Sequence, residues 1–259
     1  MRQEERALYE RIEEYITRFY RKYESERKGL GFVMTVYRRR LTSSFYAVQR
    51  SLERRLAFLR GQAGLGLVED DLEQEELSLD VDELDLADRA FFYEEIGYVE
   101  DFVRALGALG GNDSKVEQLL KDLREIFRRR DTVIIFTQYT DTMDFLREQL
   151  RQSYGTQVAC YSGRGGERWD GVMWVPVTKE EIKNAFREGE AVKILLCTEA
   201  ASEGINLQTC GVLINYDMPW NPMRVEQRIG RIDRIGQRYE RVWIRNYFYA
   251  DTVEARVYR

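Results

Sequence analysis

The second half of this chain alternates short apolar runs with segments that show a helical pattern. The clearest of the five runs is Thr132-Val133-Ile134-Ile135-Phe136, which is continuous, apolar and rich in β-branched residues. Such a run is typical of a strand that is buried on both faces of a sheet. Strands and helices that alternate at this spacing predict parallel βαβ units, and therefore a doubly wound α/β fold with helices on both faces. The strands are expected at about 132–136, 156–161, 192–197, 211–216 and 241–247.

The helices between these strands carry their own signals. A strong helix is predicted where apolar residues recur at three- and four-residue spacing from Val116 to Ile126, and another follows at about 141–152. Thr178 and Glu181 form a capping box that opens the next helix, and a last helix is expected to begin near Asp251. Residues 162–178 form an insertion whose tryptophans, Trp169 and Trp174, are expected to pack locally or to stack on a base; local packing is favoured.

Residues 5–60 predict a different, helical region. One amphipathic stripe joins Leu8, Ile12, Ile16, Phe19 and Tyr23, and Gly29 and Gly31 interrupt it. A second stripe runs from Phe45 through Val48, Leu52, Leu56 and Leu59, with Ser44 as its expected N-cap.

The formal net charge of −5 conceals an uneven distribution of charge. Residues 1–60 hold 15 basic and 8 acidic side chains, whereas residues 61–127 hold 5 basic and 19 acidic ones. The basic end and the acidic middle are therefore expected to form different surfaces. Residues 69–85, with ten carboxylates and no basic residue, are expected to be an exposed linker or a solvated helix. For Arg38-Arg39-Arg40, phosphate contact and simple solvation both stay open.

These features predict three parts: a basic α-helical region at 1–68, an acidic linker or helical connector at 69–111, and the α/β domain at 112–259.

Composition excludes several kinds of chemistry. The chain has no histidine, so Ser-His, Cys-His and His-metal mechanisms are excluded, and no metal site is predicted. Its three cysteines, Cys160, Cys197 and Cys210, show no C-x-x-C spacing and are expected to be buried in a reducing compartment. The charged N-terminus does not resemble a signal peptide, and no apolar stretch reaches the roughly 18 residues of a membrane span. A cytoplasmic location without membrane contact is expected.

An arginine-rich segment, Gln227–Gln237, carries the strongest chemical signal. Arg228, Arg231 and Arg234 lie three residues apart and would share one side of a helix with modest drift. One aspartate cannot neutralise three guanidinium groups, so a polyphosphate is the natural ligand, because the guanidinium fork matches phosphate oxygens. A solvated basic helix face is the alternative. Isoleucines at 229, 232 and 235 alternate with the arginines and favour a packed segment with directed charges, and Gly230 and Gly236 leave room for close backbone approach.

Two further segments follow predicted strands, where ligands bind in doubly wound folds. One is 136–141, and the other is 197–208, whose small residues Ala200, Ala201 and Ser202 allow a nucleotide or phosphate chain near the backbone.

In order and spacing, these segments resemble the C-terminal RecA-like lobe of superfamily-two helicases, and within it the Swi/Snf-type branch. Residues 133–139 are similar to motif IV, residues 198–208 to motif V and residues 227–237 to motif VI, and 217–222 resembles the spacer before motif VI. The form of motif VI is most similar to the bacterial RapA-like subgroup. The resemblance covers about residues 112–259, and it implies a RecA-like parallel sheet preceded by an α-helical region.

The resemblance also implies roles for the arginines. Arg231 and Arg234 match arginines that reach the γ-phosphate of an ATP bound between two lobes. Arg228 matches an additional motif VI arginine and is grouped with them as catalytic. Gln227 is expected to help position the segment around the nucleotide.

Motifs IV and V imply the remaining contacts. Thr198 is expected to contact the nucleic-acid backbone, while Gln138 and Tyr139 would line the strand-binding face. Three residues are expected near the ribose and the lobe interface: Glu203, Gly204 and Asn206.

The phosphate cradle is the missing part. No G-x-x-x-x-G-K-[ST] sequence occurs, and no Asp-Glu-x-His box occurs. Asp217 resembles a magnesium ligand superficially, but its place before motif VI favours the spacer interpretation. The chain is therefore expected to hold half of an ATP site, as a piece of a longer motor or a natural fragment, and to be inactive alone. Its expected partners are the N-terminal RecA-like lobe of the same protein, which would hold most of the Mg-ATP, and double-stranded DNA.

A second hypothesis is a non-catalytic nucleic-acid or protein interaction module that has a RecA-like fold. A Rossmann-type dinucleotide enzyme fits only the fold class, because no G-x-G-x-x-G follows a strand, and this hypothesis is discarded.

Overall fold

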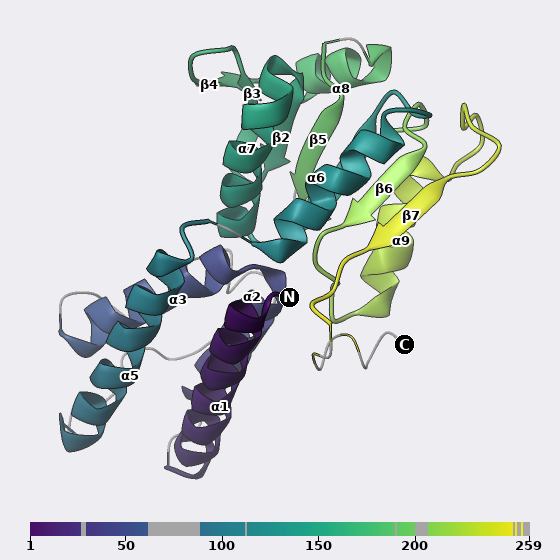
Figure 1. Cartoon of the computed structure of the whole chain (residues 1–259). Helices are drawn as coiled ribbons and strands as arrows, with labels where there is room; N and C mark the ends of the chain where they lie inside the picture. The colour runs from purple at the N-terminus through teal and green to yellow at the C-terminus, as the bar shows by residue number, and fades with distance from the viewer. Residues whose placement is uncertain are drawn as a thin grey trace. The chain divides into compact units, whose positions relative to one another are not determined.

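The computed structural model describes residues 1–26, 30–61, 89–111, 113–189, 191–199, 207–250, 252 and 255. The chain divides into two compact units, Met1–Asp113 and Ser114–Arg259 (Figure 1). The acidic segment 69–85 and Asp251, where a last helix was expected, lie outside the described residues. None of the described helices is both long enough and apolar enough to cross a membrane.

The first unit is helical, as predicted. Leu8, Ile12, Ile16 and Phe19 of the first stripe are buried, which confirms the face that α1 turns to its neighbours. Gly31 is the second residue of α2 and does not interrupt a helix. The described helices of this unit are α1 (Gln3–Glu26), α2 (Leu30–Ser43), α3 (Phe45–Leu59) and α5 (Arg89–Ala108).

Ser44 is the N-cap of α3, as the sequence predicts. Its backbone is extended, and its side-chain oxygen accepts a hydrogen bond from the backbone N–H of Ala47 at 3.0 Å. This bond satisfies one of the N–H groups that the first turn of a helix leaves without a partner. Phe45, Val48 and Leu52 follow on the buried face.

A buried ion pair joins α3 to α5. Arg55 and Glu95 both have fully buried side chains, and the guanidinium donates two hydrogen bonds of 2.8 Å to the carboxylate. The hydroxyl of Tyr15 on α1 donates to the same carboxylate at 2.7 Å. Burial raises the pKa of Tyr15 well above its ordinary value, and the negative charge of Glu95 raises it further. Three helices therefore meet at one buried carboxylate.

The acidic and basic regions are not separate surfaces where α5 is concerned. This helix belongs to the acidic middle of the sequence, yet Glu94 pairs with Arg18, Glu95 with Arg55 and Glu100 with Arg60. The prediction of two distinct surfaces was wrong here, because helix packing brings the two regions together.

The arginine run in α2 is also used within the unit. Arg38 forms an ion pair of 2.7 Å with Glu13 and donates to Thr17. Arg40 is buried and donates to the carbonyl of Ala47. For these two residues, neither of the two predicted alternatives describes the contacts that the structure shows.

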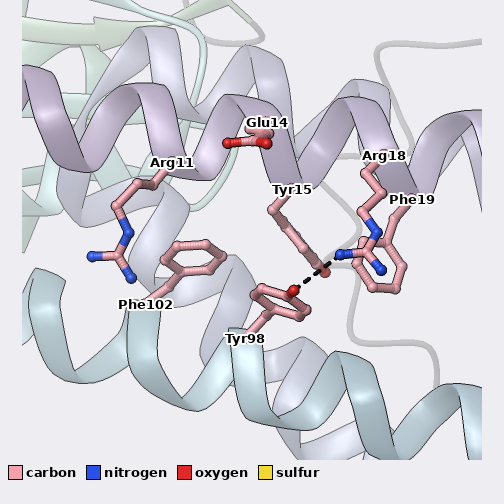
Figure 2. A pocket seen from close by; sticks show the side chains of 7 residues that line it. All are labelled: Arg11, Glu14, Tyr15, Arg18, Phe19, Tyr98 and Phe102. Carbon is pink, nitrogen blue, oxygen red and sulfur yellow. Dashed lines mark hydrogen bonds between the residues drawn. The ribbon is translucent and has the colours of Figure 1, made fainter.

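A shallow pocket of about 220 Å³ lies between α1 and α5. Figure 2 shows Tyr15, Phe19, Tyr98 and Phe102 along it, with the Arg18 guanidinium bonded to the Tyr98 hydroxyl at 2.9 Å. Three of these rings are almost fully buried, and Tyr98 is 39% exposed. Most of the aromatic surface is therefore part of the packing between the two helices.

The second unit is built on a seven-stranded sheet of order β4-β3-β2-β5-β1-β6-β7. Figure 1 shows β7 at one edge and the β3–β4 hairpin at the other. The five strands from β2 to β7 in this order are parallel, which confirms the predicted strands and the predicted fold class. The strands are β1 (Val133–Thr137), β2 (Val158–Ser162), β3 (Gly165–Trp169), β4 (Trp174–Val177), β5 (Ile194–Thr198), β6 (Val212–Asn215) and β7 (Trp243–Asn246).

Helices cover both faces of this sheet. Val133 and Ile135 of β1 pack with residues of α6 (Ser114–Ile126) and α7 (Thr140–Tyr154) in one core cluster. Ile134 and Phe136 pack on the opposite face with residues of α8 (Lys179–Glu188) and α9 (Pro222–Ile232). Successive side chains of a strand point to opposite faces, so a run that is apolar throughout needs a helical layer on each side.

The insertion at 162–178 extends the sheet as an antiparallel hairpin, which the sequence did not predict. Trp169 and Trp174 pair across β3 and β4 with ring centroids 5.5 Å apart. Trp174 donates to Glu148 on α7 at 2.7 Å, and the Arg151 guanidinium lies 4.5 Å from the Trp169 ring centroid. The favoured interpretation, local packing, is confirmed.

Two smaller predictions are also confirmed. Thr178 and Glu181 make the capping box of α8, with both reciprocal hydrogen bonds present. Cys160, Cys197 and Cys210 are buried free thiols. Burial raises the pKa of all three, that of Cys210 to about 11, so they remain protonated and unreactive at neutral pH.

Gly166 in β3 provides a test of the hairpin packing. A Cβ at this position would lie 2.5 Å from the carbonyl oxygen of Val177 and 2.6 Å from Cδ1 of Ile182. We expect Gly166→Ala to lower the free energy of unfolding of this unit by about 1–3 kcal/mol, because the backbone carbonyl cannot move aside without cost. Denaturation followed by tryptophan fluorescence measures it, since all four tryptophans lie in this unit.

The matched control is Gly230→Ala in α9, where an added Cβ meets nothing within 4 Å. Alanine favours a helix over glycine by about 1 kcal/mol, so this variant should be neutral or more stable. Equal midpoints for the two variants would contradict the packing that we describe.

Candidate nucleotide and nucleic-acid site

The carboxyl ends of three neighbouring parallel strands, β5, β1 and β6, lie side by side in the sheet. Thr137 at the end of β1 pairs in register with Thr198 at the end of β5, and Phe136 pairs with Asn215 at the end of β6. The segment predicted as motif IV ends at these strand ends, and the segment predicted as motif V begins there. The helix of the predicted motif VI, α9, packs against the same sheet through Ile232.

Hydrogen bonds of Asp217 link the segment after β6 to the end of β1. Its carboxylate accepts hydrogen bonds from the Thr137 hydroxyl at 2.6 Å and from the backbone N–H of Gln138 at 2.8 Å. The side-chain amide of Gln138 donates to the carbonyl of Met218 at 2.6 Å. Because Asp217 is buried and both its oxygens serve these bonds, the structure supports the spacer interpretation over a magnesium ligand.

The buried arginine of the predicted triplet is Arg228. Its Nε donates a hydrogen bond of 2.9 Å to one oxygen of the Glu199 carboxylate, and Nη2 lies 2.6 Å from the same oxygen in an ion pair. Nη1 donates to the Asn215 side chain at 2.8 Å and to the Asp217 carbonyl at 3.0 Å. The sequence grouped Arg228 with the catalytic arginines, whereas the structure places its charge inside the unit and neutralises it there. To reach a nucleotide it would have to break these contacts.

Arg231, in the last turn of α9, has surroundings different from those of Arg228. Its side chain is half-buried, and its Nε is shielded from solvent without a hydrogen-bond partner in the described part of the chain. No ion pair to Arg231 occurs among the residues that the structure describes. A buried donor without a partner costs about 1–3 kcal/mol, and such a group in a native protein calls for a physical explanation.

Arg234 does not lie on the helix. α9 ends at Ile232 with Asp233 as its C-cap, so the expectation of three arginines on one helical side was wrong for the third. Arg234 is exposed and donates from Nε to the carbonyl of Gly230. Ile235, expected to be packed, is 98% exposed, because the chain has left the helix before reaching it.

The other predicted residues have varied surroundings. Thr198 is almost fully buried, and its hydroxyl has no hydrogen-bond partner within the described ranges. Gln138 and Tyr139 are also buried, while Gln227 is exposed on α9. Glu203, Gly204 and Asn206 lie outside the described residues.

Glu199 was not assigned a role from the sequence. Its carboxylate binds Arg228 and also accepts from Nη1 of Arg224 at 2.8 Å. A signal existed, since Arg224 and Arg228 are four residues apart and so share a helix face that suits one carboxylate. Which carboxylate occupies that position follows only from the fold.

Comparison with known proteins identifies the second unit. The family model described as the helicase conserved C-terminal domain matches residues 114–236, from the first residue of α6 to Gly236 in the arginine segment. Residues 114–236 belong to this helicase domain family. The match includes the segments assigned to motifs IV and V and all but the last residue of motif VI, so the predicted family resemblance is confirmed.

Curated relatives agree with this assignment. An ATP-dependent helicase of Bacillus subtilis, YqhH, is 41% identical over 147 residues, which is 56% of this chain and 23% of that protein. The RNA polymerase-associated protein RapA of Vibrio campbellii is 35% identical over 126 residues, 49% of this chain and 12% of that protein. The chain therefore spans less than a quarter of the length of these relatives.

Solved structures support the same fold. The C-terminal part of the Fun30 ATPase domain matches with a TM-score of 0.58 at 16% identity, covering 100% of this chain and 85% of that one. The Hef helicase domain of Pyrococcus furiosus matches with a TM-score of 0.56 at 13% identity, covering 100% of this chain and 55% of that one. The predicted RecA-like sheet preceded by a helical region is thus confirmed.

Proposed function

We propose that this chain contributes the second motor lobe of an ATP-dependent translocase of Swi/Snf type that acts on double-stranded DNA. In this proposal Arg231 and Arg234 reach the phosphates of an ATP held mainly by an N-terminal RecA-like lobe of the same protein. The magnesium ion would be bound by that first lobe. The observation that carries the proposal is the guanidinium of Arg231, whose Nε is shielded from solvent without a hydrogen-bond partner among the described residues.

The contrast with Arg228 supports this assignment. The fold supplies Arg228 with a carboxylate, an amide oxygen and a carbonyl, whereas Arg231, less than one helical turn away, makes no such side-chain contact among the described residues. A guanidinium kept available in this way suits an anion that arrives from outside the unit. Arginine supplied across an interface stabilises the charge that develops in phosphoryl transfer.

Thr198 is the best-supported nucleic-acid contact of the three proposed. Its buried hydroxyl has no hydrogen-bond partner in the described structure and lies at the ligand-binding edge of a doubly wound sheet. Gln138 and Tyr139 are buried and would contact a strand only after a local rearrangement. Roles for Gln227 and for Glu203, Gly204 and Asn206 around the ribose remain part of the proposal on the resemblance alone.

Hydrolysis assays on two forms of the protein test the proposal. This chain alone should hydrolyse ATP no faster than a buffer control, because it holds only one side of the nucleotide site. A longer protein that carries both lobes should hydrolyse ATP, and double-stranded DNA should raise the rate. Hydrolysis by the longer protein that DNA does not stimulate would contradict a DNA translocase. No hydrolysis at all would favour a non-catalytic interaction module.

A further inference from the structure

Glu199 joins the end of β5 to α9 through one carboxylate. One oxygen accepts from Nη1 of Arg224 at 2.8 Å, and the other accepts from Nε of Arg228 at 2.9 Å and lies 2.6 Å from its Nη2 in an ion pair. The side chain of Glu199 is only 15% exposed, and that of Arg228 only 2%. Within the described residues, Glu199 is the sole carboxylate that pairs with Arg228.

The two arginines fix the position of the helix along its axis. Arg224 and Arg228 are four residues apart, so they lie one above the other on the same face of α9. A carboxylate that bonds to both of them resists rotation of the helix and sliding of the helix past the strand. Charge-assisted hydrogen bonds in a shielded position are roughly twice as strong as neutral ones, so the attachment is firm.

Each end of this Glu199–arginine contact is close in sequence to a residue of the proposed site. Thr198, the proposed nucleic-acid contact, immediately precedes Glu199 in the chain. Arg231, the proposed arginine finger, follows Arg228 by three residues, which is less than one turn of the same helix. A shift of the β5 end would therefore be transmitted to Arg231 through this carboxylate and less than one turn of helix.

We propose that Glu199 is a positioning residue that couples nucleic-acid binding at the end of β5 to the placement of Arg231. This proposal rests on the proposed function of the second lobe. In this proposal Glu199 contacts neither ATP nor DNA, and it acts by holding Arg224 and Arg228 in place. Loss of the carboxylate would leave both ligand sites in place but would weaken the communication between them.

The variant that tests the proposal is Glu199→Gln in the longer, two-lobed protein. Glutamine keeps the size of the side chain but cannot accept charge-assisted bonds from both arginines. We expect the ratio of DNA-stimulated to basal hydrolysis to fall by about 10²-fold, since a misplacement of about 1 Å at a catalytic group can have an effect of this size. The fall should appear in kcat, while the KM for ATP and the affinity for DNA change much less.

Two companion variants separate coupling from simple stabilisation. Arg224→Gln removes the less buried partner, whose side chain is 34% exposed, and should reduce the same ratio by a smaller factor. The double variant Glu199→Gln, Arg224→Gln should be no worse than Glu199→Gln alone, because both changes remove one interaction. Glu199→Asp, one methylene shorter, should recover part of the ratio.

Several outcomes would overturn the proposal. Equal losses of basal and stimulated rates, or additive effects of the two glutamine substitutions, would show that Glu199 only stabilises the fold. If Glu199→Gln lowers the tryptophan-monitored melting temperature too far to assay, Arg224→Gln decides, and an unchanged ratio there refutes the coupling.

Arg231→Ala, assayed alongside, tests the proposed function itself. If Arg231→Ala leaves the stimulated rate unchanged, the assignment of the finger fails. If it abolishes the rate while Glu199→Gln does not lower the ratio, only the coupling fails.

Discussion

Arg231→Ala is expected to abolish DNA-stimulated ATP hydrolysis in the two-lobed protein, lowering kcat by about 10³- to 10⁵-fold. The physical reason is that developing negative charge on the transferred phosphoryl group would lose a guanidinium already positioned for it. The described fold loses little by this change, because the Nε of Arg231 has no hydrogen-bond partner there. A steady-state phosphate-release assay at saturating ATP and DNA measures the effect.

Arg238→Ala is the matched control. Arg238 is an arginine of the same unit, is 59% exposed and pairs only loosely with Asp131, at 3.3 Å. Arg238→Ala changes the net charge by the same amount as Arg231→Ala. Its kcat should nevertheless stay within about twofold of the unmodified protein, since an exposed ion pair contributes little to stability. Comparable losses in the two variants would point to general electrostatics and against a specific finger.

The largest expected effect on stability comes from the helical unit. Glu95→Ala leaves the fully buried guanidinium of Arg55 without the carboxylate that neutralises it. Breaking a buried pair by removing one partner typically costs about 3–5 kcal/mol, and we expect a loss of this size in the free energy of unfolding of Met1–Asp113. Tyr15 would lose its hydrogen bond to the same carboxylate.

Glu94→Ala, one residue earlier on α5, is the control for this experiment. Its partner is Arg18, and the two side chains are 43% and 55% exposed, so its removal should cost less than about 1 kcal/mol. Tryptophan fluorescence cannot follow this unit, because no tryptophan lies in it. Hydrogen exchange of the amides in α3 and α5 measures both variants, and equal loss of protection in the two would refute the difference that we expect.

Strand positions could be predicted from the sequence because burial on both faces leaves a continuous apolar signature. The run at Val133–Thr137 shows this best, since every residue in it is buried. The hairpin of β3 and β4 could not be predicted, because Gly165-Gly166 carries no strand pattern and the strand depends on pairing with β2. The packing of α5 could not be predicted either, because it also depends on residues far away in the sequence. Glutamates of α5 form ion pairs with an arginine of α3 and with the arginine that follows α3.

The candidate site was predictable in its residue types but not in its connections. The spacing of Arg228, Arg231 and Arg234 marked an anion-binding segment without distinguishing its members. The distinction comes from neighbours that only the strand order supplies, because β5 and β6 flank β1 and bring Glu199 and Asn215 to the same guanidinium. Helix termination after Ile232 then separates Arg234 from the other two.

The hairpin at the edge of the sheet has a further consequence for association between chains. Its outer strand, β4, contains Pro176, which is exposed and can offer no N–H to a strand from another molecule. An unprotected edge strand invites pairing with other chains, and proline is one of the devices that prevent it. The insertion that lengthens this sheet therefore also protects the β4 edge against pairing with a strand from another chain.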